Sequence, residues 1–300
     1  MVGMDWVLRS PVVMLIFNRP EPTRAVFERI AAARPGKLLL IADGPRADRP
    51  GEAERCEQAR RAVLDNIDWR CEVLCNISET NLGCRKRVSS GLDWAFTQVP
   101  EAIILEDDCL PDPTLFRFFD EMLERYRSDE RVMMISGFNP LRDGWKAAAQ
   151  QYHFSYCGSI WGWASWRRAW RFYDVSMKRW GEPGAANRVK EVFGDPQLYA
   201  GRIQSYEKAF RGEIDTWDFQ WSFARAHESG LSVVPAKNLV SNIGFGADAT
   251  HTKKAHAALE AVPTEAMAFP IRFHEDVAVD REYDRAFQKA LTPPPPSARR

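Results

Sequence analysis

Short apolar runs alternate with longer amphipathic stretches through the first half of the chain. Five runs predict buried strands, at residues 12–17, 37–42, 71–76, 102–105 and 132–136. The stretches between them predict helices at 23–33, 53–66 and 84–97, and Pro111 and Pro113 open another that runs to about residue 126. Strands and helices that alternate with short connections indicate an α/β fold with a Rossmann-like, mostly parallel central sheet and helices on both faces.

The pattern becomes irregular after residue 137. Helices are expected near residues 196–211 and 217–229, and a strand near 231–235. We therefore expect one domain with two halves, residues 1–137 and residues 138–285. Four prolines at 293–296 and the Ser-Ala-Arg-Arg that follows them are unsuited to packing or to a helix, so residues 286–300 are predicted to be a flexible tail.

Composition and charge exclude several classes of protein. The 300 residues are 45% hydrophobic and 27% charged, which is ordinary for a folded globular protein. Forty-one basic residues balance 41 acidic ones, so no overall field attracts nucleic acid or an anionic membrane. The longest apolar stretch, residues 12–17, is far too short for a transmembrane segment, and the N-terminus lacks a signal-peptide core. Six cysteines form no C-x-x-C pair, which predicts free thiols and a cytoplasmic location.

Three consecutive carboxylates, Glu106, Asp107 and Asp108, come directly after the strand at 102–105. Ligands of open α/β sheets bind outside the carboxyl ends of the strands. Hard oxygen ligands suit Mg²⁺ or Mn²⁺, and Asp108 is the best placed to bind such an ion. The alternative is a solvated acidic turn that caps the next helix.

Polar residues also follow the other predicted strands. Asn18 and Arg19 follow the first strand, Asp43 the second and Asn81 the third, so all of them are expected along one edge of the sheet. No G-x-G-x-x-G or Walker lysine loop is present, so the ligand must be held in another way. For Asp43, an Asx turn that uses Gly44 is an equal alternative.

Cations open the helix at 84–97, with Arg85 and Arg87 in its first turn. Positive charge at a helix N-terminus opposes the macrodipole, and a bound anion such as a diphosphate would relieve the mismatch. A solvated basic face explains the same residues equally well.

Asp218 lies between large aromatic residues, Trp217 and Trp221, which could desolvate it and tune it as a general base. The alternative is an ordinary carboxylate at a helix N-terminus. Glu213 and Asp215 are nearby, and position alone does not decide among the three.

Aromatic and small residues alternate over 161–166, which is typical of a sugar-stacking platform that includes Trp161, or of buried core. Several tryptophans fall between Trp161 and Trp221, which predicts an aromatic surface for a ligand in the second half, with Trp161 and Trp217 as substrate-binding residues. His251 follows a glycine-rich loop that could close over a ligand. A metal or phosphate role for this histidine competes with an ordinary structural one.

Together, residues 11–252 resemble the GT-A nucleotide-sugar glycosyltransferases, and specifically a bacterial group similar to the N-acetylglucosaminyltransferase I branch. The order and spacing of five short motifs carry the resemblance: Phe-Asn-Arg-Pro at 17–20, Ala-Asp-Gly-Pro at 42–45, Asn-Leu-Gly at 81–83, Glu-Asp-Asp at 106–108 and Trp-Asp at 217–218.

The resemblance implies that Asn18, Arg19 and Asp43 hold the uridine end of a UDP-sugar. It places Arg85 or Arg87 near the diphosphate.

It also implies that Glu106 and Asp107 touch the ribose or the sugar and that Asp108 binds Mn²⁺. Asp218 matches the catalytic base, although Phe219 replaces a second acidic residue of the family. His251 resembles a late histidine that completes the metal site in many of these enzymes and is missing from some of this branch.

The function that follows is an inverting, metal-dependent transferase, which moves GlcNAc or a related hexose from a UDP-sugar to a hydroxyl of a glycan, lipid-linked saccharide or protein. Two rivals remain. A sugar-phosphate nucleotidyltransferase would need a basic glycine-rich loop after the first strand, and Asn18-Arg19-Pro20 is not one. A carbohydrate-binding module would bind sugar through its tryptophans, without nucleotide or metal.

Overall fold

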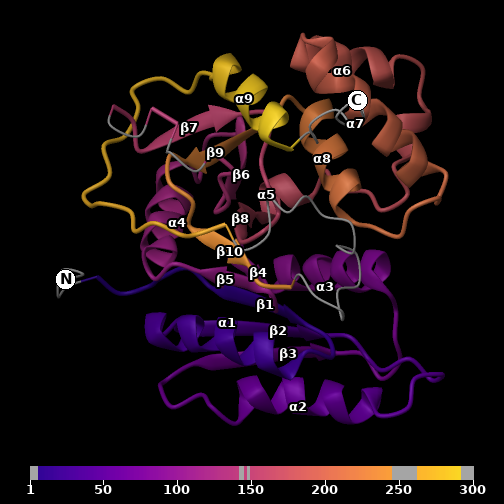
Figure 1. Ribbon diagram of the computed structural model, residues 1–300, viewed down its shortest axis with the longest axis vertical. Coiled ribbons are helices and arrows are strands. Elements are labelled where there is room, and N and C mark those ends of the chain that lie inside the picture. The colour runs from indigo at the N-terminus through magenta and orange to yellow at the C-terminus, as the bar shows by residue number, and fades with distance from the viewer. Residues whose placement is uncertain (1–5, 142–144, 147–148, 245–261, 292–300) are drawn as a thin grey trace, which may run out of the picture.

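An eight-stranded sheet runs through both halves of the chain (Figure 1). The computed structural model describes residues 6–141, 145–146, 149–244 and 262–291. In spatial order the strands are β3 (Glu72–Ile77), β2 (Lys37–Ala42), β1 (Val12–Ile16), β4 (Glu101–Glu106), β8 (Trp163–Trp166), β6 (Val132–Ser136), β9 (Leu231–Pro235) and β7 (Tyr152–Ser155). Only β8 and β7 run against the other six. The predicted α/β class with a mostly parallel sheet is confirmed.

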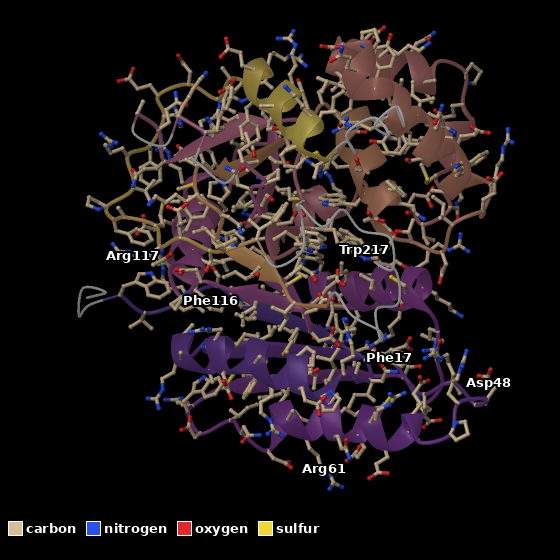
Figure 2. The ribbon with its side chains drawn as sticks, in the orientation of Figure 1. Phe17, Asp48, Arg61, Phe116, Arg117 and Trp217 are labelled. Carbon is tan, nitrogen blue, oxygen red and sulfur yellow. The ribbon has the colours of Figure 1, made fainter. Side chains whose placement is uncertain are left out.

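Helices cover both faces of this sheet. One face is covered by α1 (Pro20–Ala33), α2 (Glu52–Leu64) and α4 (Thr114–Arg125), and the other by α3 (Cys84–Gln98), α5 (Arg167–Trp170) and α8 (Asp218–His227). Along β1, Val12 and Met14 pack on the first side and Val13 on the second, because successive side chains of a strand point to opposite faces. Figure 2 labels one buried aromatic residue from each side, Phe116 and Trp217. Burial on both faces explains why the strands read as continuous apolar runs.

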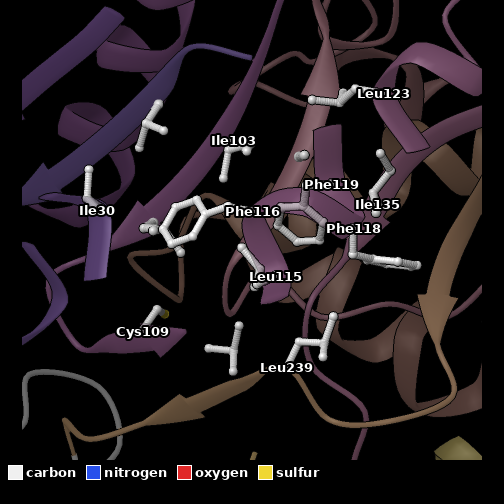
Figure 3. Close-up of a cluster of buried hydrophobic side chains, with 14 of the residues drawn as sticks. Ile30, Ile103, Cys109, Leu115, Phe116, Phe118, Phe119, Leu123, Ile135 and Leu239 are labelled. Atoms are coloured by element: carbon white, nitrogen blue, oxygen red, sulfur yellow. The ribbon is translucent and has the colours of Figure 1, made fainter. Parts of the chain in front are cut away.

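On the first face of the sheet, α4 packs against the central strands (Figure 3). Phe116, Phe118 and Phe119 of α4 are fully buried there beside Ile103 of β4 and Ile135 of β6. A buried side chain of this size stabilises the fold by about 1.5–3 kcal/mol. The strand that precedes the acidic triplet therefore has a rigid support.

The second half adds a helical cap and a small second sheet. The cap contains η1 (Lys178–Gly181), α6 (Ala185–Phe193), α7 (Pro196–Phe210) and α9 (Arg281–Leu291), which share a separate apolar cluster with α8. In the small sheet, β10 (Val240–Asn242) pairs antiparallel with β5 (Cys109–Pro111). This pairing sets Asn242 opposite Cys109, directly after the acidic triplet.

Most elements lie within a few residues of their predicted positions, and the exceptions have physical causes. β5, β7, β8 and β10 have four residues or fewer, too short for a clear period in the sequence. The predicted start of the tail at residue 286 is wrong, because α9 runs to Leu291 and buries Tyr283 and Phe287, one helical turn apart, in the cap. Residues 292–300 lie outside the described part of the chain.

Two further expectations concern membranes and cysteines. Within the described ranges, no helix is both long enough and apolar enough to cross a membrane. All six cysteines are free thiols, as predicted.

Gly91 provides a test of the packing between α3 and β2. A Cβ at this position would lie 2.5 Å from the Cγ2 of Ile41, which is itself buried. We predict that Gly91→Ala lowers the free energy of unfolding by about 1–3 kcal/mol in urea denaturation. Gly201→Ala is the matched control, because Gly201 lies in α7 with nothing within 4 Å of its Cβ position. It should raise stability by about 0.5–1 kcal/mol, and an equal effect of both changes would contradict the close packing.

Candidate functional site

The candidate site lies where the strand order of the sheet reverses. From β1 the chain proceeds through β2 and β3 on one side, whereas β4 pairs with β1 on the other. The carboxyl ends of β1 and β4 are therefore a topological switch point, the usual ligand position in open α/β sheets. Asn18 and Arg19 follow β1, and the acidic triplet ends β4, so the structure brings these predicted residues together.

Arg19 joins the two strand ends. Its Nη2 forms a salt bridge with Asp107 and lies 3.0 Å from Oδ2 of Asp108. The backbone N–H of Phe17 donates to Oδ2 of Asp107 over 3.3 Å. Burial raises the pKa of Asp107 to about 6, although the charge of Arg19 opposes this shift. The guanidinium thus offsets part of the negative charge at the end of β4.

Glu106 is the most perturbed of the three carboxylates. Burial raises its pKa to about 8, and the charges of Asp108 and Asp107 add to the shift. Its Oε1 is buried and has no hydrogen-bond partner among the described residues. A buried carboxylate oxygen without a partner is costly, so this atom is suited to a ligand hydroxyl or a cation.

Asp218 approaches the triplet from the second half. It is the first residue of α8, where the helix dipole favours a carboxylate, and the hydroxyl of Thr216 donates to its Oδ1. Its charge also raises the pKa of Glu106. The other two candidates for the general base, Glu213 and Asp215, are exposed, unlike Asp218. Asp215 lies 3.9 Å from Nε of Arg85.

Cys84, the first residue of α3, lies within reach of the same charges. Burial raises its pKa, and the carboxylates of Glu106, Asp218, Asp215 and Asp43 add to the shift, in that order. The N-terminus of α3 therefore lies close to the acidic groups of β4 and α8, although the sequence drew no attention to this cysteine.

Asp43 holds a loop in place. Its Oδ1 accepts from the N–H groups of Gly44 and Leu82, both over 2.9 Å. Its Oδ2 accepts from Nδ2 of Asn81 over 2.9 Å and from the N–H of Gly83 over 3.2 Å. These four bonds occupy the lone pairs of the carboxylate. In this arrangement Asp43 therefore has the structural role of an Asx turn with Gly44, which was the alternative to ligand binding. The side-chain amide of Asn81 donates to Asp43 and to the carbonyl of Gly44, so it also holds this loop in place.

The two arginines of α3 have different environments. Arg87 is buried and donates to the backbone carbonyl of Asn76 and, over 2.8 Å, to its Oδ1. Burial lowers the pKa of Arg87. Arg85 is 38% exposed, so it is the one accessible to an anion at the N-terminus of α3.

Trp217 is part of the buried core and not of a ligand-binding surface, so the prediction that it contacts the substrate is wrong. Trp217 is 2% exposed and stacks on Trp163 with 5.6 Å between ring centroids. It belongs to a tryptophan cluster with Trp170 and Trp221 because α8 buries it against the sheet. Trp161 is partly buried and packs edge-on against a phenylalanine, with 4.8 Å between centroids.

The segment after β10 covers Asp108. The N–H of Ile243 donates to the backbone carbonyl of Asp108 over 2.8 Å, and Nδ2 of Asn242 lies 3.4 Å from its Oδ1. Gly244 is so close that a Cβ there would lie 2.2 Å from Oδ2 of Asp108. His251 lies outside the described residues. Where the structure describes the chain, no three His, Cys, Asp or Glu groups are arranged to hold a metal by themselves.

Glu52 and Arg46 were missed by the sequence analysis. The carboxylate of Glu52 is fully buried and binds Asn18 over 2.8 Å, as well as Arg46. No sequence signal marks this role, because a glutamate at the start of a helix is expected to be solvated.

Comparisons with known proteins give a distant likeness. No model of a known protein family and no curated protein matches the chain. The fold resembles apo mouse xyloside xylosyltransferase 1 with a TM-score of 0.36 and 10% identity, over 73% of this chain and 83% of that one. It also resembles UDP-glucose pyrophosphorylase complexed with UDP-glucose, with a TM-score of 0.24 and 8% identity, over 44% of this chain and 65% of that one. At such low TM-scores neither likeness decides the function.

The pKa of Glu106 predicts a pH-dependent stability. Since burial raises this pKa from 4.5 to about 8, the stabilising protonated form is fully present below about pH 4.5 and is lost as the pH rises toward 8. We predict that Glu106→Gln, which mimics the protonated form, is more stable than the wild type at pH 8 by more than about 1 kcal/mol and equally stable at pH 4.5. Urea denaturation in metal-free buffer measures this difference. The exposed Glu54→Gln should follow the wild type, and a Glu106→Gln curve parallel to both would refute the shift.

Proposed function

We propose that this protein is an inverting, metal-dependent GT-A glycosyltransferase that transfers GlcNAc or a related hexose from a UDP-sugar to a hydroxyl group. One observation carries the proposal: three carboxylates end β4 at the switch point of the sheet, and Asp218 of α8 lies close enough to raise the pKa of Glu106. A ligand between β4 and α8 would meet a metal-binding group on one side and a base on the other.

The donor nucleotide is assigned to the loops after β1 and β2. Asn18 and Arg19 follow β1, and Arg85 is the more accessible of the two arginines in the first turn of α3. Backbone N–H groups and the dipole at such a terminus favour a diphosphate. Asp43 contributes indirectly, because its four hydrogen bonds hold the loop that leads into α3.

The carboxylates at the end of β4 suit a divalent cation. The Oε1 of Glu106 lacks a partner within the described chain, and the single guanidinium of Arg19 offsets only part of the negative charge of the three carboxylates. Mg²⁺ and Mn²⁺ commonly bind one or two carboxylates together with substrate phosphates. Asp108 would hold the ion, which when bound offsets the charge that develops on the departing UDP.

Proton transfer is assigned to Asp218. A carboxylate there takes the proton of the acceptor hydroxyl, which then attacks the sugar from the face opposite the diphosphate. One such displacement inverts the anomeric centre. Burial raises the pKa of Glu106 to about 8, and in its protonated form this side chain can donate a hydrogen bond to a sugar oxygen. The acceptor is a saccharide, a lipid-linked saccharide or a protein.

Asp108→Asn tests the metal assignment. The substitution removes the charge and keeps the size, which matters because Gly244 leaves no room for a larger group. We predict that Mn²⁺-dependent binding of UDP weakens at least about tenfold in isothermal titration calorimetry. Asp68→Asn, at a 79% exposed side chain, is the control and should bind as the wild type does. Metal dependence that survives in Asp108→Asn would refute the assignment.

Asp218→Asn tests the base. Binding of UDP with Mn²⁺ should remain, whereas transfer to the acceptor should fall by about 10²–10⁴-fold, as expected when a general base is lost. The assay follows release of UDP from UDP-GlcNAc and related UDP-sugars with candidate acceptors. Asp215→Asn is the matched control, since Asp215 is exposed and should keep most of its turnover. The reverse result would move the base to Asp215.

A further inference from the structure

Glu52 connects the loops that follow β1 and β2. It is the first residue of α2, and its carboxylate is fully buried. It accepts hydrogen bonds from the backbone N–H of Arg46 over 2.7 Å, from Nε of Arg46 over 3.0 Å and from Nδ2 of Asn18 over 2.8 Å. Hydrogen bonds from Arg46 lower the pKa of Glu52 to about 2. The side chain is therefore an anion at neutral pH.

An ionised carboxylate can only accept hydrogen bonds, and this fact orients Asn18. The NH₂ group of the amide must face Glu52, because the opposite orientation would bring two oxygens together. Oδ1 of Asn18 is thereby turned away from Glu52. Among the described residues this oxygen has no hydrogen-bond partner. Asn18 is partly exposed at the carboxyl end of β1, so its oxygen is available to a ligand.

We propose that Glu52 is a positioning residue that makes Asn18 present a hydrogen-bond acceptor to the nucleobase, so that the site selects a base with a ring N–H, such as uracil, over cytosine. The inference rests on the proposed nucleotide-sugar function and extends it to a residue outside the acidic triplet. With the base in the same position, uracil turns its N3–H donor toward Oδ1, whereas cytosine turns its N3 acceptor toward it, and the N4 amine of cytosine would reach Oδ1 only if the base shifted. Guanine also has a ring N–H beside a carbonyl, so purine size must be tested separately.

Two groups that can stack on a nucleobase lie beside this amide, the side chains of Arg46 and Phe17. The guanidinium of Arg46 lies 5.6 Å from the centroid of the Phe17 ring, and its side chain is 39% exposed. Phe17 directly precedes Asn18, at the end of β1 (Figure 2). Guanidinium planes and aromatic rings both stack on nucleobases. Glu52 thus holds a stacking group and a hydrogen-bonding group with one carboxylate.

The test measures dissociation constants of UDP, CDP and GDP with Mn²⁺ by isothermal titration calorimetry. We expect the wild type to prefer UDP to CDP by about tenfold or more, as a lost or unpaired polar contact costs that much. In Glu52→Gln the new amide can donate or accept, so Asn18 is released and the preference should fall to within about twofold. Glu54→Gln, an exposed position on the same helix, should keep the wild-type preference.

A double change separates orientation from general damage. In Asn18→Asp with Glu52→Gln, the new glutamine can donate to the new carboxylate, which again presents an acceptor. This protein should regain the UDP preference although Arg46 still lacks its anion. Asn18→Ala keeps Glu52 and Arg46 paired and should also lose the preference, so it carries the test if Glu52→Gln does not fold.

The outcomes are distinct. A wild type that binds UDP, with an unchanged UDP preference in Glu52→Gln or in Asn18→Ala, overturns the role of Glu52 and leaves the proposed function intact. Loss without recovery in the double variant also overturns it. Equal binding of GDP and UDP by the wild type contradicts the choice of uracil. A wild type that binds no nucleotide overturns the proposed function and this inference with it.

Discussion

The site depends on one electrostatic constraint: three consecutive carboxylates lie at the end of a buried strand, and one guanidinium pairs with two of them. Unscreened repulsion among neighbouring anions in a poorly solvated site is costly. Arg19, which follows the adjacent strand β1, offsets part of this repulsion. It can reach the carboxylates because β1 and β4 are parallel neighbours, with Leu15 opposite Glu106. Glu106, which lacks such a partner in the described chain, responds instead with a pKa raised by burial. The pairing of β1 with β4 therefore also brings Arg19 to the carboxylates whose charge it offsets.

Several polar residues that the sequence marks as candidates for ligand binding instead form hydrogen bonds within the protein. Asp43 holds the loop before α3 with four hydrogen bonds, and Arg87 binds the end of β3. Such groups can matter to function by keeping neighbours in place, since a binding constellation needs supporting contacts that lock its side chains. Glu52 extends the same principle to the loop after β1. Most of the polar residues near the switch point thus form an internally bonded frame, which also includes Asp108 through Arg19 and Asp218 through Thr216.

The second half completes the site from a distance in sequence. β10 pairs with β5 directly after the triplet, and the chain continues to Gly244, which packs on Asp108. α8 brings Asp218 to the same region because Trp217 and Trp221 anchor the helix in the core on the second face. The buried tryptophans therefore fix the position of α8. The carboxylate of Asp218, which lies between them in the sequence, remains only partly buried.

Three features follow from the amino-acid pattern alone: the α/β class, the order of the main strands and helices, and the gathering of Asn18, Arg19 and the acidic triplet at one edge. Apolar periodicity and the parallel sense of βα units are local properties with a known consequence. Four other features required the folded chain: β8 lies between β4 and β6, Trp217 is buried in the core, Asp43 accepts four hydrogen bonds, and Glu52 is buried against Asn18. Each of these depends on partners far away in the chain. Short strands and single polar side chains carry no periodic signal, so their roles follow from which surfaces pack together.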